Sequence, residues 1–143
     1  MKNYHPCFII PCYNHGSQLA LIIEKFVAFN IPIIIVNDGS TDSTAETLEE
    51  IKTLFPSIQI ITLTKNQGKG KALMMGFKAA VALQFTHAIQ VDADGQHDLK
   101  DIPLFLKVSS EQLSALISGH PVYDESIPKS RLYSRYITHF WVW

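Results

Sequence analysis

The chain has 143 residues, a length that fits one ordinary domain with a single hydrophobic core. Hydrophobic residues make up 47% of it and charged residues 17%, and 12 basic against 13 acidic side chains give a formal net charge of −1. These values exclude a disordered tail and a coiled coil, and they give no electrostatic reason to expect a nucleic-acid partner.

Apolar runs of strand length alternate along the chain with segments whose apolar residues recur at helical spacing. In chain order the pattern predicts strand 7–11, helix 19–30, strand 33–36, helix 43–55, strand 58–63, helix 71–83, strand 88–91, helix 101–108 and strand 113–117. This alternation is typical of an α/β, Rossmann-like fold with a mostly parallel central sheet and helices on both faces. We expect one core over residues 1–120, followed over 121–143 by a loop and the start of a truncated helix.

Local signals mark several of the predicted helices. Ser43 followed by Glu46 is a capping box, and Asp98 is a candidate cap for the helix that begins near residue 101. The helix over 71–83 is predicted to pack through four apolar residues, Ala72, Met75, Ala79 and Ala82.

The two cysteines, Cys7 and Cys12, have no partner spacing that suits zinc, so we expect reduced thiols. The N-terminal residues do not read as a secretory signal, and no apolar run approaches the ~20 residues of a membrane-spanning helix. We therefore expect a cytoplasmic protein.

Candidate site residues lie at the carboxyl ends of four of the predicted strands, where the loops of an open parallel sheet gather and ligands bind. They are Pro11, Tyr13 and Asn14, then Asn37 to Ser40, then the loop Asn66 to Gly70, then Asp92 and Asp94. If the strands are parallel, all four groups meet at one edge.

Asp92 and Asp94 form the sharpest of these signals. Residues i and i+2 on an extended backbone point the same way about 6.5–7 Å apart, where two carboxylates oppose each other's ionisation unless a cation joins them. Oxygen-only ligands favour Mg²⁺ or Mn²⁺, with Gln96 as a further carbonyl donor. The alternative is an ordinary solvated turn.

Other acidic-motif interpretations fit less well. A calcium loop starting at Asp92 requires Gly and Glu where the chain has His97 and Pro103, so that interpretation fails. A phosphatase with an Asp nucleophile stays a minor alternative, because Gln96 stands where a hydroxyl residue is expected. No Ser lies in a Gly-x-Ser-x-Gly elbow, so covalent hydrolase chemistry has no support.

The glycine loop before residue 71 has two interpretations. It matches neither a dinucleotide fingerprint nor a Walker A loop, so Gly68 and Lys69 either cradle a phosphate or form an ordinary helix entry. Asp38 likewise either receives a base or ribose or stabilises its own turn, and Tyr13 either stacks on a base or covers the core.

Taken together and in this order, four segments resemble the nucleotide-sugar half of the family 2 glycosyltransferases. These are inverting enzymes of the GT-A fold that include dolichyl-phosphate mannosyltransferase. The matching segments are Ile9 to Asn14, Val36 to Asp42, Asn66 to Leu73 with Gly76, and Val91 to His97. The resemblance covers roughly residues 6–120.

The resemblance implies a donor nucleotide site and a metal site. The nucleotide site would comprise Pro11, Tyr13, Asn14, Asp38, Gly39, Gly68, Lys69 and Asp92. The Mn²⁺ or Mg²⁺ ion would be held by Asp92, Asp94 and Gln96. The implied reaction transfers a hexose from a UDP- or GDP-linked sugar to an acceptor with inversion, in cell-envelope glycan synthesis. A non-catalytic nucleotide-sugar-binding or assembly module of the same fold is the alternative.

Two positions depart from the family pattern: His15 stands where many members have Glu, and Asn37 replaces the first of two Asp residues. The usual catalytic Asp follows the segment that ends near Pro121, and neither Asp124 nor Glu125 is assigned to that role. The aromatic tail from Arg131 favours an apolar–polar boundary. A polyprenyl phosphate or other lipid acceptor, with peripheral contact at the inner face of the membrane, is therefore expected.

Overall fold

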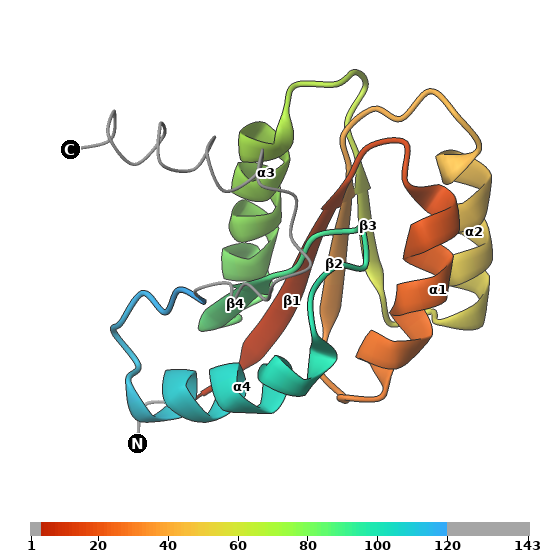
Figure 1. The fold of residues 1–143 in the computed structure, drawn as a ribbon. Coiled ribbons are helices and arrows are strands. Elements are labelled where there is room, and N and C mark those ends of the chain that lie inside the picture. The colour runs from red at the N-terminus through yellow and green to blue at the C-terminus, as the bar shows by residue number, and fades with distance from the viewer. Residues whose placement is uncertain (1–3, 120–143) are drawn as a thin grey trace, which may run out of the picture.

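The computed structural model describes residues 4–119 (Figure 1). Strands and helices alternate in the order β1 (Pro6–Cys12), α1 (Gly16–Val27), β2 (Ile33–Asn37), α2 (Thr44–Leu54), β3 (Gln59–Thr62), α3 (Lys69–Ala82), β4 (His87–Gln90), a 3₁₀ turn η1 (Leu99–Asp101) and α4 (Ile102–Glu111). The four strands form one parallel sheet in the order β3-β2-β1-β4. The predicted alternation over residues 7–108 is confirmed.

The two central strands carry the core on both faces of the sheet. Every residue of β2 is buried, as are all residues of β1 after Pro6. Helices α1 and α2 cover one face together with Ile102 of α4, whereas α3 covers the other (Figure 1). The predicted α/β class with helices on both faces is therefore confirmed, and continuous apolar runs suit strands covered in this way.

Helix α3 packs through small residues at every fourth position. Its buried residues are Ala72, Gly76 and Ala80, and a Cβ added at Gly76 would lie 2.5 Å from Ile9 Cγ2. The helix therefore approaches β1 more closely than any larger side chain would allow. Of the four residues predicted to pack, Ala72 is buried, and Met75 and Ala79 are partly buried against the same core. The prediction for Ala82 is wrong, since that residue is exposed: the buried row runs through Gly76 and Ala80 instead.

The start of α2 differs from the predicted capping box. Ser43 occupies the N-cap position but makes no side-chain capping hydrogen bond. Asp42 Oδ1 instead accepts a hydrogen bond from the Thr44 backbone N–H at 3.0 Å. Asp98 does act as a cap, since its Oδ1 accepts from the Lys100 N–H at 3.0 Å at the turn that leads into α4.

Residues 113–117 do not form the predicted fifth strand. The Ala115 N–H donates to the Gln112 carbonyl in a turn, and the Leu116 side chain is 97% exposed. No strand among residues 4–119 pairs with this run. An apolar run cannot form the backbone hydrogen bonds of a sheet unless another strand lies beside it. The predicted loop and helix over 120–143, with Asp124 and Glu125, lie outside the described residues. Within residues 4–119, no helix has the length and apolar character that crossing a bilayer requires.

Candidate functional site

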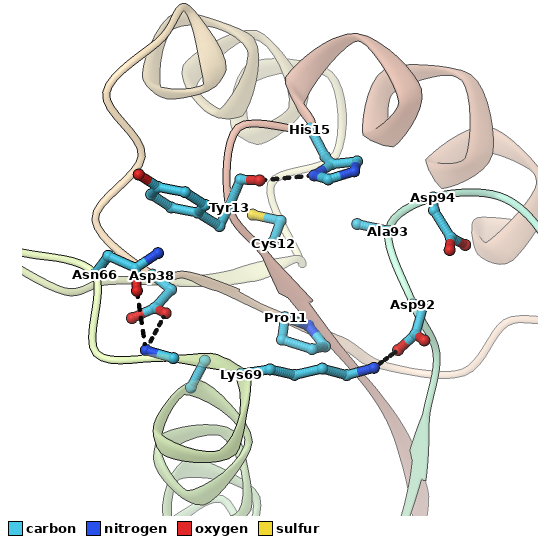
Figure 2. A pocket seen from close by; sticks show the side chains of 12 residues that line it. Pro11, Cys12, Tyr13, His15, Asp38, Asn66, Lys69, Asp92, Ala93 and Asp94 are labelled. Carbon is cyan, nitrogen blue, oxygen red and sulfur yellow. Dashed lines mark hydrogen bonds and ion pairs between the residues drawn. The ribbon is translucent and has the colours of Figure 1, made fainter. Parts of the chain in front are cut away.

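A cavity of about 350 Å³ opens at the carboxyl edge of the sheet (Figure 2). It is enclosed by the end of β1 and the residues that follow it, by Asp38 after β2, by the loop between β3 and α3 with the beginning of α3, and by residues that follow β4. The predicted site residues that line it are Pro11, Tyr13, Asp38, Gly68, Lys69, Asp92 and Asp94. The other three, Asn14, Gly39 and Gln96, lie in the adjoining loops. The predicted convergence of four strand ends is thus present in the structure.

Asp38 is a buried residue of the cavity wall and is hydrogen-bonded to the glycine loop. Only 3% of it is exposed, its Oδ1 accepts from the Gln67 N–H at 2.9 Å and its Oδ2 from the Gly68 N–H at 2.8 Å. Hydrogen bonds to a carboxylate are stronger than neutral ones, so Asp38 fixes the loop that leads to Lys69. A carboxylate has about four acceptor directions, so this leaves two for a ligand donor.

Gly39 brings the loop after β2 into contact with the loop after β3. Its φ is +65°, and a Cβ there would lie 2.3 Å from the Lys65 carbonyl carbon. Both the backbone torsion and the space therefore demand glycine. Gly39 acts on the shape of the site and does not line the cavity.

Asn14 joins the loop after β1 to the loop after β2. Its Oδ1 accepts from the Thr41 N–H at 2.9 Å, and its own N–H donates to Ser40 Oγ at 3.0 Å. Asn14 has a φ of +54°, a conformation that Asn tolerates better than most residues. These bonds position the neighbouring Tyr13, which lines the cavity and is 39% exposed.

Asp92 and Lys69 form an ion pair inside the cavity. Lys69 Nζ lies 2.6 Å from Asp92 Oδ1, which also accepts from Gln90 Nε2 at 3.2 Å. His97 Nε2 lies 3.7 Å from the other carboxylate oxygen. Burial alone would raise the pKa of Asp92, but the hydrogen bonds from Lys69 and Gln90 and the charges of Lys69 and His97 together lower it. Asp92 is thus held in its ionised form.

Asp94 lines the same cavity from an exposed turn, where its Oδ1 accepts from the Gln96 N–H at 3.0 Å. Asp92 and Asp94 together offer two carboxylates with oxygen donors only, a set that fits Mg²⁺ or Mn²⁺. Among residues 4–119, no group of three or more His, Cys, Asp or Glu side chains converges on one point. A metal ion here would therefore take its remaining ligands from water and from the oxygens of a bound anion.

Sequence reasoning placed Asn66 in a loop expected at this edge, but it missed Cys12, His15, Ala72 and Ala93, which also line the cavity. Each of these residues is next to a predicted residue in the sequence or lies one helical turn from one. The signal that could have found them is therefore their position beside the predicted site residues in the fold. His15 Nδ1 donates to the Tyr13 carbonyl at 2.6 Å and supports the loop after β1.

Both cysteines are free thiols, as predicted. Cys12 lines the cavity, and burial, followed by the charges of Asp42 and Asp38, raises its pKa to about 12. Burial raises the pKa of Cys7 to about 11. The thiolate, which is the reactive form, is therefore scarce at neutral pH.

Comparison with known proteins identifies the family. Residues 7–142 match the model of glycosyl transferase family 2. The chain belongs to this family. The family and GT-A fold predicted from the four segments are confirmed.

Two curated relatives carry glycosyltransferase names. This family 2 chain is 30% identical over 142 residues to the putative glycosyltransferase CsbB of Bacillus subtilis. The match covers 95% of this chain and 42% of CsbB. This chain is 36% identical over 111 residues to the undecaprenyl-phosphate 4-deoxy-4-formamido-L-arabinose transferase of Pectobacterium atrosepticum, covering 72% of this chain and 33% of that protein. The chain thus spans less than half the length of both relatives.

A solved structure with the same fold is the mannosyltransferase PcManGT from Pyrobaculum calidifontis in complex with GDP-mannose and Mn²⁺. The TM-score is 0.57 at 18% sequence identity, over 70% of this chain and 30% of that one. At this identity the likeness establishes the fold alone.

Proposed function

We propose that this family 2 domain binds a nucleoside-diphosphate sugar with Mn²⁺ or Mg²⁺ and serves the transfer of the sugar, with inversion, to an acceptor. The observation that carries the proposal is that Asp38, Lys69, Asp92 and Asp94 line one cavity at the carboxyl edge of the sheet. This edge is where open α/β sheets bind ligands.

The proposed roles follow from what each side chain offers. Tyr13 presents a half-exposed ring on which a base can stack, and Asp38 has acceptor directions left for a base N–H. Lys69 supplies a positive charge for the diphosphate, and Asp92 and Asp94 would hold the metal ion. When bound, such an ion stabilises the negative charge that grows on the departing nucleoside diphosphate.

The proposed acceptor is a polyprenyl phosphate or another lipid phosphate at the cytoplasmic face of a membrane. Support comes from the Pectobacterium relative, whose name specifies undecaprenyl phosphate. A phosphate acceptor is already ionised at neutral pH, so its attack on the sugar carbon needs no catalytic base. An alcohol acceptor would need one, and neither Asp124 nor Glu125 is assigned to that role.

Binding of the donor tests the proposal. We expect UDP-, GDP- or dTDP-sugars to raise the melting temperature of the chain in the presence of Mn²⁺, because a ligand that binds only the folded state stabilises it. Asp94→Ala should abolish this Mn²⁺-dependent shift without altering the melting temperature of the free protein. Asp101→Ala, which removes an exposed carboxylate outside the cavity, is the matched control.

The results separate three outcomes. An equal shift in the wild type and in Asp94→Ala would refute the metal assignment. A shift without donor hydrolysis or transfer, in this chain and in a version extended beyond Trp143, would favour a non-catalytic binding module. No shift with any donor would refute the proposed function.

A further inference from the structure

Lys69 reaches across the candidate cavity to Asp92. Lys69 is the first residue of α3, Asp92 follows β4, and the distance from Nζ to Oδ1 is 2.6 Å. Figure 2 shows the extended lysine side chain passing Pro11 on its way to the carboxylate. The side chains of Lys69 and Asp92 are 54% and 30% exposed, so both can exchange partners with a ligand.

This contact is unusual among the described residues. Within residues 4–119, it is the only ion pair between a lysine and a carboxylate. Holding a long side chain in one extended geometry costs conformational entropy, so an isolated exposed pair would be weak. Here the Gln90 amide donates to the same carboxylate oxygen, and both Lys69 and Asp92 line the cavity.

The geometry makes the lysine a competitor of the metal ion. Oδ1 of Asp92 accepts from Lys69 and from Gln90, and Oδ2 faces His97 at 3.7 Å. A divalent cation at Asp92 would stand beside the ammonium group, and the two positive charges would repel each other. The ion therefore has to displace Lys69 before it can use this carboxylate fully.

Once displaced from Asp92, the Lys69 ammonium group needs another anion as its partner. The diphosphate of the proposed donor would bind in the same cavity and can take that place. The flexible four-carbon stem of Lys69 lets Nζ move without any change in α3. The hydrogen bonds that the Gln67 and Gly68 N–H groups donate to Asp38 hold the backbone before Lys69 in place. Only the lysine side chain has to move.

We propose that Lys69 is an exchangeable internal cation, which neutralises Asp92 while the cavity holds no ligand and transfers to the diphosphate when metal ion and nucleotide bind together. This inference rests on the proposed function, because it takes its ligands from there. It has a definite consequence: metal ion alone binds weakly, and each ligand strengthens the binding of the other by the same factor.

Substitution of Lys69 should change the two kinds of binding in opposite directions. In Lys69→Met, Mn²⁺ alone should bind several-fold more tightly, because no internal cation competes for Asp92. A nucleoside diphosphate with Mn²⁺ should bind more weakly, because the diphosphate loses its cation. The factor by which UDP or GDP strengthens Mn²⁺ binding should fall by about fivefold or more.

The experiment is a Mn²⁺ titration of the full chain, followed by the electron paramagnetic resonance signal of free Mn²⁺, without nucleotide and with saturating UDP or GDP. Lys71→Met is the matched control, because Lys71 is an exposed lysine of the same helix that does not line the cavity. It should behave as the wild type does. Lys69→Arg, which retains the charge, should retain most of the coupling, and circular dichroism checks that each variant is folded.

The inference is overturned if Lys69→Met binds Mn²⁺ alone no more tightly than the wild type, including the case in which neither binds it measurably. That failure differs from failure of the proposed function. The latter would appear in the wild type itself, as an absence of Mn²⁺-dependent nucleotide binding or as binding that Asp94→Ala leaves unchanged.

Discussion

Asp38 has a structural role that its place after a strand does not reveal. The sequence predicts either a turn-stabilising Asp or a base-binding one, and the structure shows hydrogen bonds to the N–H groups of a different loop, at Gln67 and Gly68. A turn residue would bond within its own loop. Asp38 therefore joins the end of β2 to the start of α3. Any contact it makes with a ligand depends on these two hydrogen bonds, which fix its position.

Replacement of Asp38 by Asn should destabilise the fold. The amide keeps the volume of the side chain, but it has one oxygen for two N–H donors and places its own N–H₂ against the second. We expect the free energy of unfolding to fall by about 1–3 kcal/mol, the cost of a buried unsatisfied group. Urea denaturation measures this, with Asp101→Asn at an exposed position as control. Equal midpoints for Asp38→Asn and the wild type would contradict the structural role.

At the scale of elements, an apolar run in the sequence correctly predicts a strand only where other elements of the fold pair with it or pack on it. β1 and β2 are predicted well because both faces of each are buried, so nearly every residue is apolar. Residues 113–117 give the same kind of signal, yet they have no strand ladder within residues 4–119. The sequence pattern also does not show which face of α3 packs on the sheet. Gly76 contributes no apolar side chain to the pattern, although it lies where the helix comes close to β1.

Gly76 should not tolerate alanine, although alanine favours helices. An added Cβ would lie 2.5 Å from Ile9 Cγ2 and 3.3 Å from Val36 Cγ2, so α3 would have to move away from the sheet. We expect Gly76→Ala to lower the free energy of unfolding by about 1–3 kcal/mol, outweighing a helix-propensity gain of about 1 kcal/mol. Gly70→Ala in the same helix is the control, because its Cβ would meet nothing within 4 Å. It should leave stability unchanged or raise it, and similar denaturation midpoints for both variants would refute the close packing.

At the scale of the whole molecule, parallel topology explains why the site was predictable in outline. Four polar segments far apart in sequence end at one edge because their strands are parallel, and sequence order alone implies this once the strands are assigned. The partners of individual side chains do not follow from topology. From the sequence, Lys69 could equally well face solvent, a ligand or Asp92. Only the positions of α3 and β4 around β1 determine that Lys69 and Asp92 meet.

The ion pair between Lys69 and Asp92 should affect how the free energy of unfolding depends on pH. The pKa of Asp92 is lowered in the folded chain from its ordinary value of 3.8, so the unfolded state binds the proton more readily. The resulting stabilisation is fully present above the unfolded pKa and is lost as the pH falls through the folded pKa. Since both side chains are partly exposed, we expect under about 1 kcal/mol. Thermal melts of the wild type and Lys69→Met should differ by a constant amount from pH 7 to about 5 and converge below about pH 4. A difference that persists unchanged at pH 3 would mean that Lys69 stabilises the fold through packing of its stem rather than through its charge.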